Sequence, residues 1–391
     1  MKAPVQAKTS IANWICKMID GKRVLVVKLG TSTLTDETGR IDSAYMDNLA
    51  KQIVEIRQQG WLTIIVTSAG IAAGLEVLGE TERPTDTPSL QAAASVGCVA
   101  LSQAYAQAFA PYGMVVSSVL LTRRDTASRP VYLHARDTLE RLLNWGVVPI
   151  VNENDTISIE QIRFGDNDTL SALVACLVQA DEAIIFSDVD GLYDKNPSTH
   201  DDAVLLPMVS CIDESIMGGA EGPGSKLASG GMITKIRAAR VLLSAGIPLT
   251  ICNGQTENAL PRFVSGERIG TRFAREGVAH EITPKKLWIA LGDSSHGVLK
   301  VDDGCKRALM NRGSSLLSVG VLNVDGDFIA GDVVDIVDVN DHLFARGRID
   351  FSSDETRLAQ GRSNVTLQSN SLLAHMAERP LVHRDELILF D

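Results

Sequence analysis

The sequence predicts an α/β protein with a mainly parallel sheet, covered by helices on both faces, and a small β-rich second domain. Between about Lys22 and Asn253, short apolar runs of strand length alternate with longer segments of helical periodicity. The strand runs are apolar throughout, which is typical of parallel strands buried on both faces. After about residue 274 the pattern changes to short strands separated by Asp-Gly and Gly-Asp turns, which indicates a different, β-rich unit.

The elements can be assigned in order along the chain. Six strands are expected in the first domain: Val24–Leu29, Leu62–Thr67, Val115–Leu120, Val147–Val151, Glu182–Ser187 and Pro248–Cys252. Five longer segments are expected as helices: Tyr45–Gln59, Ser89–Phe109, Ala135–Asn144, Leu170–Gln179 and Ile233–Ala245. Five short strands are expected in the second domain: Trp288–Leu291, Gly297–Val301, Gly320–Val324, Val333–Val337 and Ala345–Ile349.

A chain of 391 residues exceeds one ordinary domain. We expect five parts, which are an N-terminal extension (1–21), the α/β domain (22–274), a linker (275–284), the β-rich domain (285–370) and a C-terminal tail (371–391).

Composition indicates a globular protein and argues against several kinds of partner and site. With 45% hydrophobic and 22% charged residues the chain is globular, and a formal net charge of −11 disfavours binding to nucleic acids or anionic membranes. The six cysteines are scattered without a CxxC pair, so neither a zinc site nor a disulfide framework is expected. No run approaches 18 apolar residues and the N-terminus lacks a signal peptide's apolar core, which together predict a reduced, cytoplasmic protein.

Polar clusters at predicted strand ends are the most informative feature. Val151–Asp155 reads Val-Asn-Glu-Asn-Asp after a buried strand, and Phe164–Asp168 reads Phe-Gly-Asp-Asn-Asp before a helix. Asp and Asn also gather in turns and at N-caps for local hydrogen bonds, but two such clusters beside one strand favour a site. Ligands of open α/β sheets bind beyond the carboxyl ends of the strands, and Mg²⁺ prefers oxygen ligands together with substrate phosphates. The clusters therefore predict a place for a small polar substrate and a magnesium–phosphate group.

Phosphate groups need positive charge and free backbone amides, and the chain offers both at other strand ends. Lys28 ends the first strand just before Gly30, and Lys235 lies in the first turns of a helix opened by Ser229, Gly230 and Gly231. Small residues from Thr67 to Gly74 would let amides approach an anion, and Ser187-Asp188 follows another apolar strand. Lys28 could instead be a surface lysine beside an ordinary turn. A lysine within a buried strand is unfavourable unless it has a role, so a phosphate-binding role is the better interpretation.

Other catalytic motifs are missing. The glycines before Ser225-Lys226 follow no apolar strand, and their Lys and Ser stand in the wrong order for a P-loop. No G-x-G-x-x-G follows a strand, and no G-x-S-x-G nucleophile turn is present. The pattern instead indicates phosphoryl transfer through lysines, backbone amides and Mg²⁺ to a carboxylate, which is ionised at neutral pH and needs no general base.

The order of these motifs resembles the glutamate 5-kinase family, the proline-pathway branch of the amino-acid kinases. The runs that carry the resemblance are Val26–Ser32, Asn152–Asp155, Phe164–Asp168, Asp190–Tyr193 and Gly230–Lys235, with support from Leu133–Leu143 and His383–Asp385. The second domain, with Gly313–Leu317 and Gly320-Val321, resembles the PUA domain of many bacterial members. The resemblance covers nearly everything after residue 22 and implies the three-layer amino-acid-kinase sandwich.

The resemblance also implies the activity and the residues involved. The expected reaction is ATP-dependent phosphorylation of the γ-carboxylate of L-glutamate to L-glutamyl 5-phosphate, with Mg²⁺ as cofactor. The implied catalytic residues are Lys28, Lys235 and Asp168, and those for glutamate are Ser68, Asp155 and Asn167. ATP would be bound by Lys28, Gly30, Ser187, Asp188, Ser229, Gly230, Gly231, Met232, Ile233, Thr234 and Lys235, and no residue is assigned as a direct metal ligand. The family further suggests feedback inhibition by proline, a dimer or tetramer, and glutamyl-phosphate reductase as the downstream partner.

One departure from the family concerns Ser68-Ala69-Gly70, where Ser-Gly-Ala is usual, because a methyl group then stands where an amide approaches the ligand. Three alternatives remain open. The chain could be a related kinase for aspartate, acetylglutamate or a nucleotide, or a regulatory homologue with weakened activity. It could also act through its C-terminal domain as an RNA-binding module, although that region has 12 Lys and Arg against 16 Asp and Glu from residue 285 onward.

Overall fold

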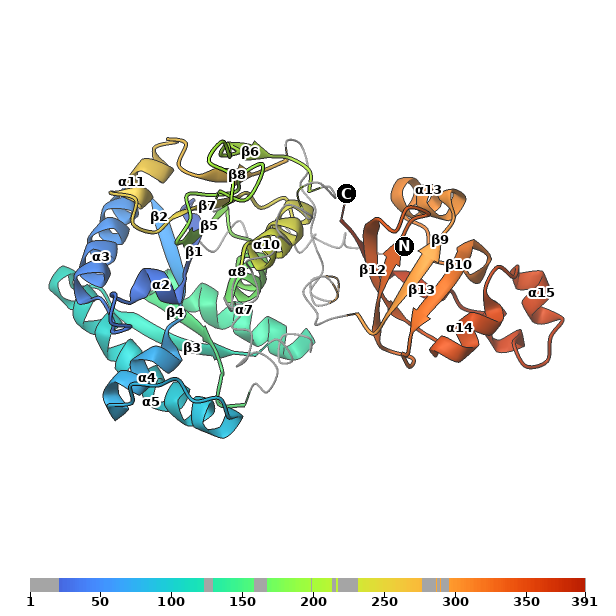
Figure 1. Cartoon of the computed structure of the whole chain (residues 1–391), viewed down its shortest axis with the longest axis horizontal. Helices are drawn as coiled ribbons and strands as arrows, with labels where there is room; N and C mark the ends of the chain where they lie inside the picture. The colour runs from blue at the N-terminus through green and yellow to red at the C-terminus, as the bar shows by residue number, and fades with distance from the viewer. Residues whose placement is uncertain are drawn as a thin grey trace, which may run out of the picture.

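The first domain is built on one eight-stranded sheet with the order β3-β4-β2-β1-β5-β7-β8-β6 (Figure 1). The computed structural model describes residues 21–122, 129–157, 167–197, 199–212, 216, 231–275, 286, 289 and 295–390. The strands are β1 (Arg23–Leu29), β2 (Trp61–Val66), β3 (Val116–Leu121), β4 (Val148–Glu153), β5 (Glu182–Ser187), β6 (Met208–Val209), β7 (Leu249–Asn253) and β8 (Thr271–Phe273). Neighbours pair in parallel except β7 with β8, which are antiparallel, so the predicted mainly parallel sheet is confirmed.

Helices cover both faces of this sheet and make a three-layer sandwich, as Figure 1 shows for α3 and α11 on one side and α8 and α10 on the other. The helices of this domain are α2 (Thr31–Leu34), α3 (Ser43–Gln58), α4 (Gly70–Leu78), α5 (Thr87–Phe109), η1 (Ala110–Tyr112), α7 (Arg129–Asn144), α8 (Asn167–Leu177), α10 (Met232–Ser244) and α11 (Ala259–Val264). One hydrophobic cluster joins the sheet to α3, α5 and α11, and the other joins it to α7, α8 and α10.

Local signals explain where the helices begin and which face they bury. Asp42 caps α3 by accepting a hydrogen bond from the backbone N–H of Tyr45 at 2.9 Å, and the buried face of α3 includes Met46, Leu49 and Ile53. Helix α8 differs, because every residue from Asp168 to Leu177 is buried. A helix buried all round needs no polar face, which explains why Ser171 is the one polar residue between Leu170 and Leu177.

Two glycines allow α4 and α5 to pack with their backbones in contact. A Cβ atom at Gly74 would lie 1.8 Å from the carbonyl oxygen of Ala93, and one at Gly97 would lie 1.7 Å from that of Gly70. Any larger residue would therefore push the two helices apart. This close approach fixes the N-terminus of α4 at the carboxyl end of β2.

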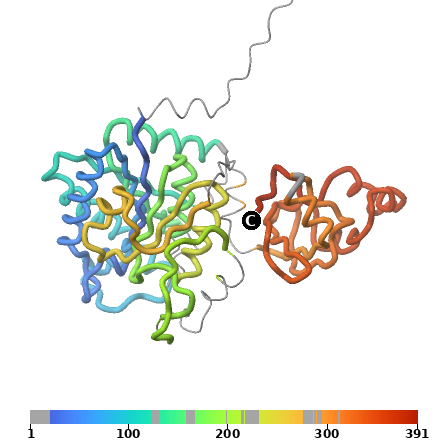
Figure 2. The backbone as a smooth tube through the Cα atoms, turned by 90° about the horizontal axis from the view of Figure 1, so that it is seen from above, coloured from blue at the N-terminus to red at the C-terminus, as the bar shows by residue number. Residues whose placement is uncertain are grey.

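The second domain has its own five-stranded sheet and hydrophobic core, and Figure 2 shows it as a separate unit. Its strand order is β10-β9-β11-β12-β13, with β9 (Gly297–Val301), β10 (Val321–Gly326), β11 (Val333–Val337), β12 (Leu343–Ile349) and β13 (Val382–Leu389). Its helices are α13 (Asp303–Arg312), η2 (Ser318–Gly320), α14 (Ser353–Ala359), α15 (Asn364–Gln368) and η3 (Ala374–Ala377). The predicted strand Trp288–Leu291 falls largely outside the described residues, and Ile289 within it is helical and buried.

The C-terminal segment 371–391, predicted as a tail, contains a strand of this sheet. β13 pairs antiparallel with β12, from Val382 opposite Ile349 to Leu389 opposite Ala345. The polar run from His383 to Glu386 does not show the apolar pattern from which a strand is predicted. These side chains lie largely exposed at the edge of the sheet, while Leu387 and Ile388 are buried.

The end of β13 also contacts the first domain. Ile388 belongs to the hydrophobic cluster around α8 and α10, and Phe390 packs against that cluster. The guanidinium of Arg240 on α10 lies 5.4 Å from the centre of the Phe390 ring, and Ser244 Oγ donates to the carbonyl oxygen of Leu389 at 3.4 Å. Of the helices described here, none combines the length and apolar character needed to cross a membrane.

Candidate active site

Two buried lysines from distant parts of the chain meet at one carboxylate. Lys28 near the end of β1 places its Nζ 2.7 Å from Asp168 Oδ1, and Lys235 on α10 places its Nζ 3.3 Å from Asp168 Oδ2. The exposed fractions are only 6% for Lys28, 5% for Lys235 and 1% for Asp168. Buried ions persist only when they are paired, so the carboxylate holds the two ammonium groups at one place.

The electrostatics of this triad keep the carboxylate ionised. Burial by itself raises the pKa of Asp168, but the charges of Lys28 and Lys235, with a hydrogen bond from Thr234, lower that pKa to about 2. Burial lowers the pKa of Lys235, and the charge of Lys28 lowers it further, while Asp168 and Asp188 oppose both effects. The site therefore carries two positive charges against one buried negative charge, and its net charge suits an anionic group such as a phosphate.

The start of α10 contributes a hydroxyl to the same carboxylate. Thr234 Oγ1 lies 2.6 Å from Asp168 Oδ2 and 2.8 Å from the carbonyl oxygen of Gly231, the N-cap residue of the helix. Met232 and Ile233 form the first turn of α10, next to backbone N–H groups that have no partner within the helix. Ser229 and Gly230, also predicted to bind ATP, lie outside the described residues.

The residues predicted to hold the acceptor substrate gather at the carboxyl ends of β2 and β4. Asn167 Nδ2 donates to Ser68 Oγ at 3.0 Å and to the carbonyl oxygen of Thr67 at 2.8 Å. Asn152 Oδ1 lies 3.3 Å from the same nitrogen, so this side chain joins the cluster. Sequence reasoning placed Asn152 in the first polar motif but did not assign it a role, although its position at a strand end was the available signal.

Asp155 lies at the edge of this cluster in a poorly hydrated position. Burial raises the pKa of Asp155 to about 6, against an opposing effect of the positive charge of Arg83. A Cβ atom built on Gly70 would lie 3.9 Å from Asp155 Oδ2 and 3.3 Å from Asn152 Nδ2. Gly70 therefore lies against both polar groups, where a side chain would crowd them.

Ala69 has the left-handed backbone conformation that glycine normally adopts. Its φ is 68° and its ψ is 10°, and it precedes the first residue of α4. This conformation costs an alanine about 1–2 kcal/mol relative to the right-handed region. The family usually has Ser-Gly-Ala here, whereas this chain has Ser68-Ala69-Gly70. The methyl group therefore lies on Ala69, the residue with the strained backbone, and not on position 70, which faces the polar cluster.

A larger side chain at this position should disrupt the site. We expect Ala69→Val to lower the free energy of unfolding by about 2 kcal/mol or more, because a β-branched residue is rarely compatible with positive φ. Ala69→Gly should change it by less than about 1 kcal/mol, since relief of strain offsets the greater freedom of the unfolded chain. Denaturant unfolding measures both. Ala44→Val, at an exposed helical position, is the matched control, and equal losses in the two valine variants would contradict the assignment of strain to Ala69.

The predicted nucleotide residues lie at the carboxyl ends of β1 and β5, beside the lysines. A Cβ atom on Gly30 would lie 3.7 Å from Lys28 Nζ, and Ser187 Oγ donates to Asp188 Oδ1 at 3.0 Å. Asn253 at the end of β7 donates through Nδ2 to Asp190 Oδ1 at 3.0 Å. Asn253 was not among the predicted site residues, although it stands at the end of an apolar run, whereas Asp190 begins one of the sequence runs that carry the family resemblance.

The side chains around the triad offer few groups for direct binding of Mg²⁺. Among the described residues, no cluster of three or more His, Cys, Asp or Glu side chains could cage a metal ion. The two lysines next to Asp168 also oppose direct binding of a cation by that carboxylate. These groups fit a Mg²⁺ that is held mainly by phosphate oxygens and water, as is usual for this ion in phosphotransferases.

Both domains of the chain match known protein families. Residues 23–253 match the model of the amino acid kinase family, and residues 297–369 match that of the PUA domain. The chain is 45% identical to a glutamate 5-kinase of Moorella thermoacetica over 94% of this chain and 96% of the relative. It is 40% identical to a glutamate 5-kinase of Caldanaerobacter subterraneus subsp. tengcongensis over 94% and 98%. A solved UMP kinase from Bacillus anthracis aligns with 65% of this chain and 97% of its own, at 16% identity and a TM-score of 0.45.

Proposed function

Since the chain belongs to the amino acid kinase family, with a PUA domain at its C-terminal side, we propose that it phosphorylates the γ-carboxylate of L-glutamate with ATP. The product is L-glutamyl 5-phosphate, and the reaction is the first step of proline biosynthesis. The observation that carries the proposal is the convergence of Lys28 and Lys235 on Asp168, which directly follows Asn167 of the polar cluster. The glutamate 5-kinases at 40% and 45% identity support the choice of glutamate.

The lysines act on the phosphoryl group in transfer. An oxygen of the γ-carboxylate attacks the γ-phosphorus of ATP, the bond from that phosphorus to the β–γ bridging oxygen breaks, and ADP leaves with that electron pair. The acceptor is already ionised, so no proton has to move and no general base is required. Lys28 and Lys235 stabilise the negative charge on the transferred group, and Asp168 holds both in position before substrate binds.

The remaining residues position the two substrates. Ser68, Asp155 and Asn167 bind glutamate, with the Asp155 carboxylate facing the substrate ammonium group. ATP is bound by Gly30, Ser187, Asp188 and the segment from Ser229 to Lys235, in addition to Lys28. Mg²⁺ would enter with the phosphates and reduce their negative charge. The proposal also includes feedback inhibition by proline and assembly into a dimer or tetramer. Glutamyl-phosphate reductase would take up the labile acyl phosphate product.

Acyl phosphate formation tests the proposal directly. Hydroxylamine converts an acyl phosphate to a coloured hydroxamate, so the protein with ATP, Mg²⁺ and hydroxylamine should give hydroxamate from glutamate. Aspartate and acetylglutamate in place of glutamate should give much less. A higher kcat/KM for either of these acceptors would contradict the substrate assignment, and no ATP-dependent hydroxamate from any of the three would contradict the reaction itself.

The raised pKa of Asp155 predicts how substrate affinity depends on pH. Below about pH 6 this carboxyl is protonated and no longer attracts the substrate ammonium group, so KM for glutamate should rise as pH falls through 6. Asp155→Asn should raise KM by roughly 10- to 100-fold at pH 7.5, which is the scale of a charged hydrogen bond. It should also remove most of the pH dependence of KM.

The same pKa shift predicts an opposite effect on stability. A carboxyl whose pKa is raised on folding destabilises the folded state when ionised, and this cost grows as pH rises from about 4 through 6. Asp155→Asn should therefore raise the free energy of unfolding at pH 7 by on the order of 1–3 kcal/mol. Asp47→Asn, at an exposed position of α3, is the matched control for both measurements. An unchanged KM in Asp155→Asn would show that this residue does not contact glutamate.

A further inference from the structure

A pocket opens far from the lysines, over the amino-terminal part of the same sheet. Its volume is about 320 Å³, within the range of small-molecule sites. Arg23, Trp61 and Glu182, which line it, are the first residues of β1, β2 and β5. Along β1, Arg23 and Lys28 are five residues apart, which corresponds to roughly 16 Å. The pocket is therefore separate from the candidate active site.

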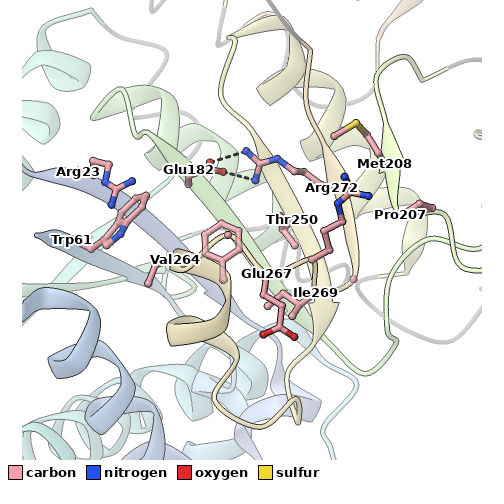
Figure 3. Close-up of a pocket in the computed structure, with 14 residues that line it drawn as sticks. Arg23, Trp61, Glu182, Pro207, Met208, Thr250, Val264, Glu267, Ile269 and Arg272 are labelled. Atoms are coloured by element: carbon pink, nitrogen blue, oxygen red, sulfur yellow. Dashed lines mark hydrogen bonds and ion pairs between the residues drawn. The ribbon is translucent and has the colours of Figure 1, made fainter. Parts of the chain in front are cut away.

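Buried apolar side chains form part of the floor and walls of this pocket. Trp61 and Phe263 are 3% and 8% exposed, and Ile269 is 7% exposed. Thr250 on β7 also lines the pocket, and it is 2% exposed. Trp61 and Thr250 come from the sheet and Ile269 from the segment that joins α11 to β8, as Figure 3 shows, while Phe263 belongs to α11. Such a surface accepts the apolar body of a small molecule.

The charged groups of the lining leave positive charge available. Glu182 forms a two-point ion pair with Arg272, at 2.8 Å and 3.0 Å, as the dashed lines of Figure 3 mark. Glu267 is paired in the same way with Arg262, which does not line the pocket. Within the described part of the chain, neither Arg23 nor Arg268 forms an ion pair with a carboxylate.

Arg23 is also held in place. Its guanidinium carbon lies 4.1 Å from the centre of the Trp61 ring, which is close enough for a cation–π interaction. An arginine fixed on an aromatic floor loses little freedom when it binds, and its planar fork matches a carboxylate or a phosphate. Both lining carboxylates are already paired, so they do not repel a bound anion strongly.

We propose that this pocket binds a small organic anion, in which a carboxylate or phosphate group contacts Arg23 and Arg268 and an apolar body packs on Trp61 and Phe263. The site is independent of phosphoryl transfer, because none of its lining residues belongs to the candidate active site. The two guanidinium groups select an anionic group on the ligand, and the pocket volume limits the size of the ligand.

Ligand-observed NMR titration of the full chain tests this proposal, with phenyl phosphate and benzoate as anionic probes and benzyl alcohol as an uncharged probe of similar shape. Saturating ADP, Mg²⁺ and glutamate are present throughout. At least one anion should bind at least 10-fold more tightly than benzyl alcohol, and Arg23→Gln and Arg268→Gln should each weaken that binding by about 10-fold or more. The tighter of the two anions identifies the preferred group.

Two controls distinguish this pocket from the active site and from general charge effects. Arg141→Gln makes the same charge change on an exposed part of α7, and it should leave binding of the anion unchanged. Lys28→Ala should also leave it unchanged, whatever reaction the lysines support. Equal binding of the anions and benzyl alcohol, equal binding by all the arginine variants, or loss of binding in Lys28→Ala would each overturn the proposal.

Discussion

Replacing either Lys28 or Lys235 by alanine should lower kcat for glutamate phosphorylation by about 10²- to 10³-fold. This is the scale for loss of one preorganised group that stabilises charge in a transition state. Both ammonium groups are buried and lie within 3.3 Å of the same carboxylate, so each is oriented before the substrates bind. Hydroxamate formation under saturating glutamate and ATP measures the effect on kcat.

The double variant gives a sharper test of convergence. Because the two lysines act on one phosphoryl group, the loss in the double variant should be smaller than the product of the two single losses. Lys51→Ala, on the exposed side of α3, is the matched control and should keep normal turnover. Near-normal kcat in both single variants would remove the proposed mechanism, and fully multiplicative losses would indicate that the lysines act at separate steps.

Asp168→Asn should cause the largest loss of stability among the changes considered. The substitution preserves shape but removes the carboxylate that pairs with both buried ammonium groups, and breaking a buried ion pair in this way costs about 3–5 kcal/mol. Activity should also fall, because the lysines lose the group that positions them. Denaturant unfolding at pH 7 measures the stability change, and Asp47→Asn is a matched surface control.

The pH dependence of this effect follows from the lowered pKa of Asp168. A carboxyl whose pKa is depressed on folding stabilises the folded state above its unfolded pKa, near 4, and this contribution is lost as pH falls through about 2. The parent should therefore lose stability between pH 4 and pH 2 more steeply than Asp168→Asn. Equal stability of the two proteins at pH 7 would show that the lysines find other partners and that Asp168 does not hold the triad together.

Much of the fold was predictable because the relevant signals are local. A buried parallel strand must be apolar along its length, and a helix on its face must have apolar residues with a period of 3.6. For this reason β1, β2, β4, β5 and β7 and the long helices α3, α5, α7, α8 and α10 can be predicted directly. β6 and β8 are two and three residues long, too short to show a period. β13 was not predicted as a strand because the first half of its sequence is polar.

The candidate site divides in the same way. The sequence identified Lys28, Asp168 and Lys235 individually, since each stands at the end of a strand or in the first turns of a helix, where small or polar neighbours are a local signal. The Asn253–Asp190 and Asn152–Asn167 contacts depend on which elements are neighbours in the folded sheet. Strand order is a long-range property that single-sequence patterns do not carry.

By itself, the sequence determined the type of fold, most of its longer strands and helices, and the candidate residues for phosphate binding, because these depend on side-chain chemistry and short-range periodicity. Only the tertiary structure decided that two lysines share one carboxylate, that Ala69 has a strained backbone, that the last strand contacts α10, and that a pocket lined by arginines opens over the sheet. Each of these depends on segments that are far apart in the chain, and their packing in space sets burial, distance and charge together.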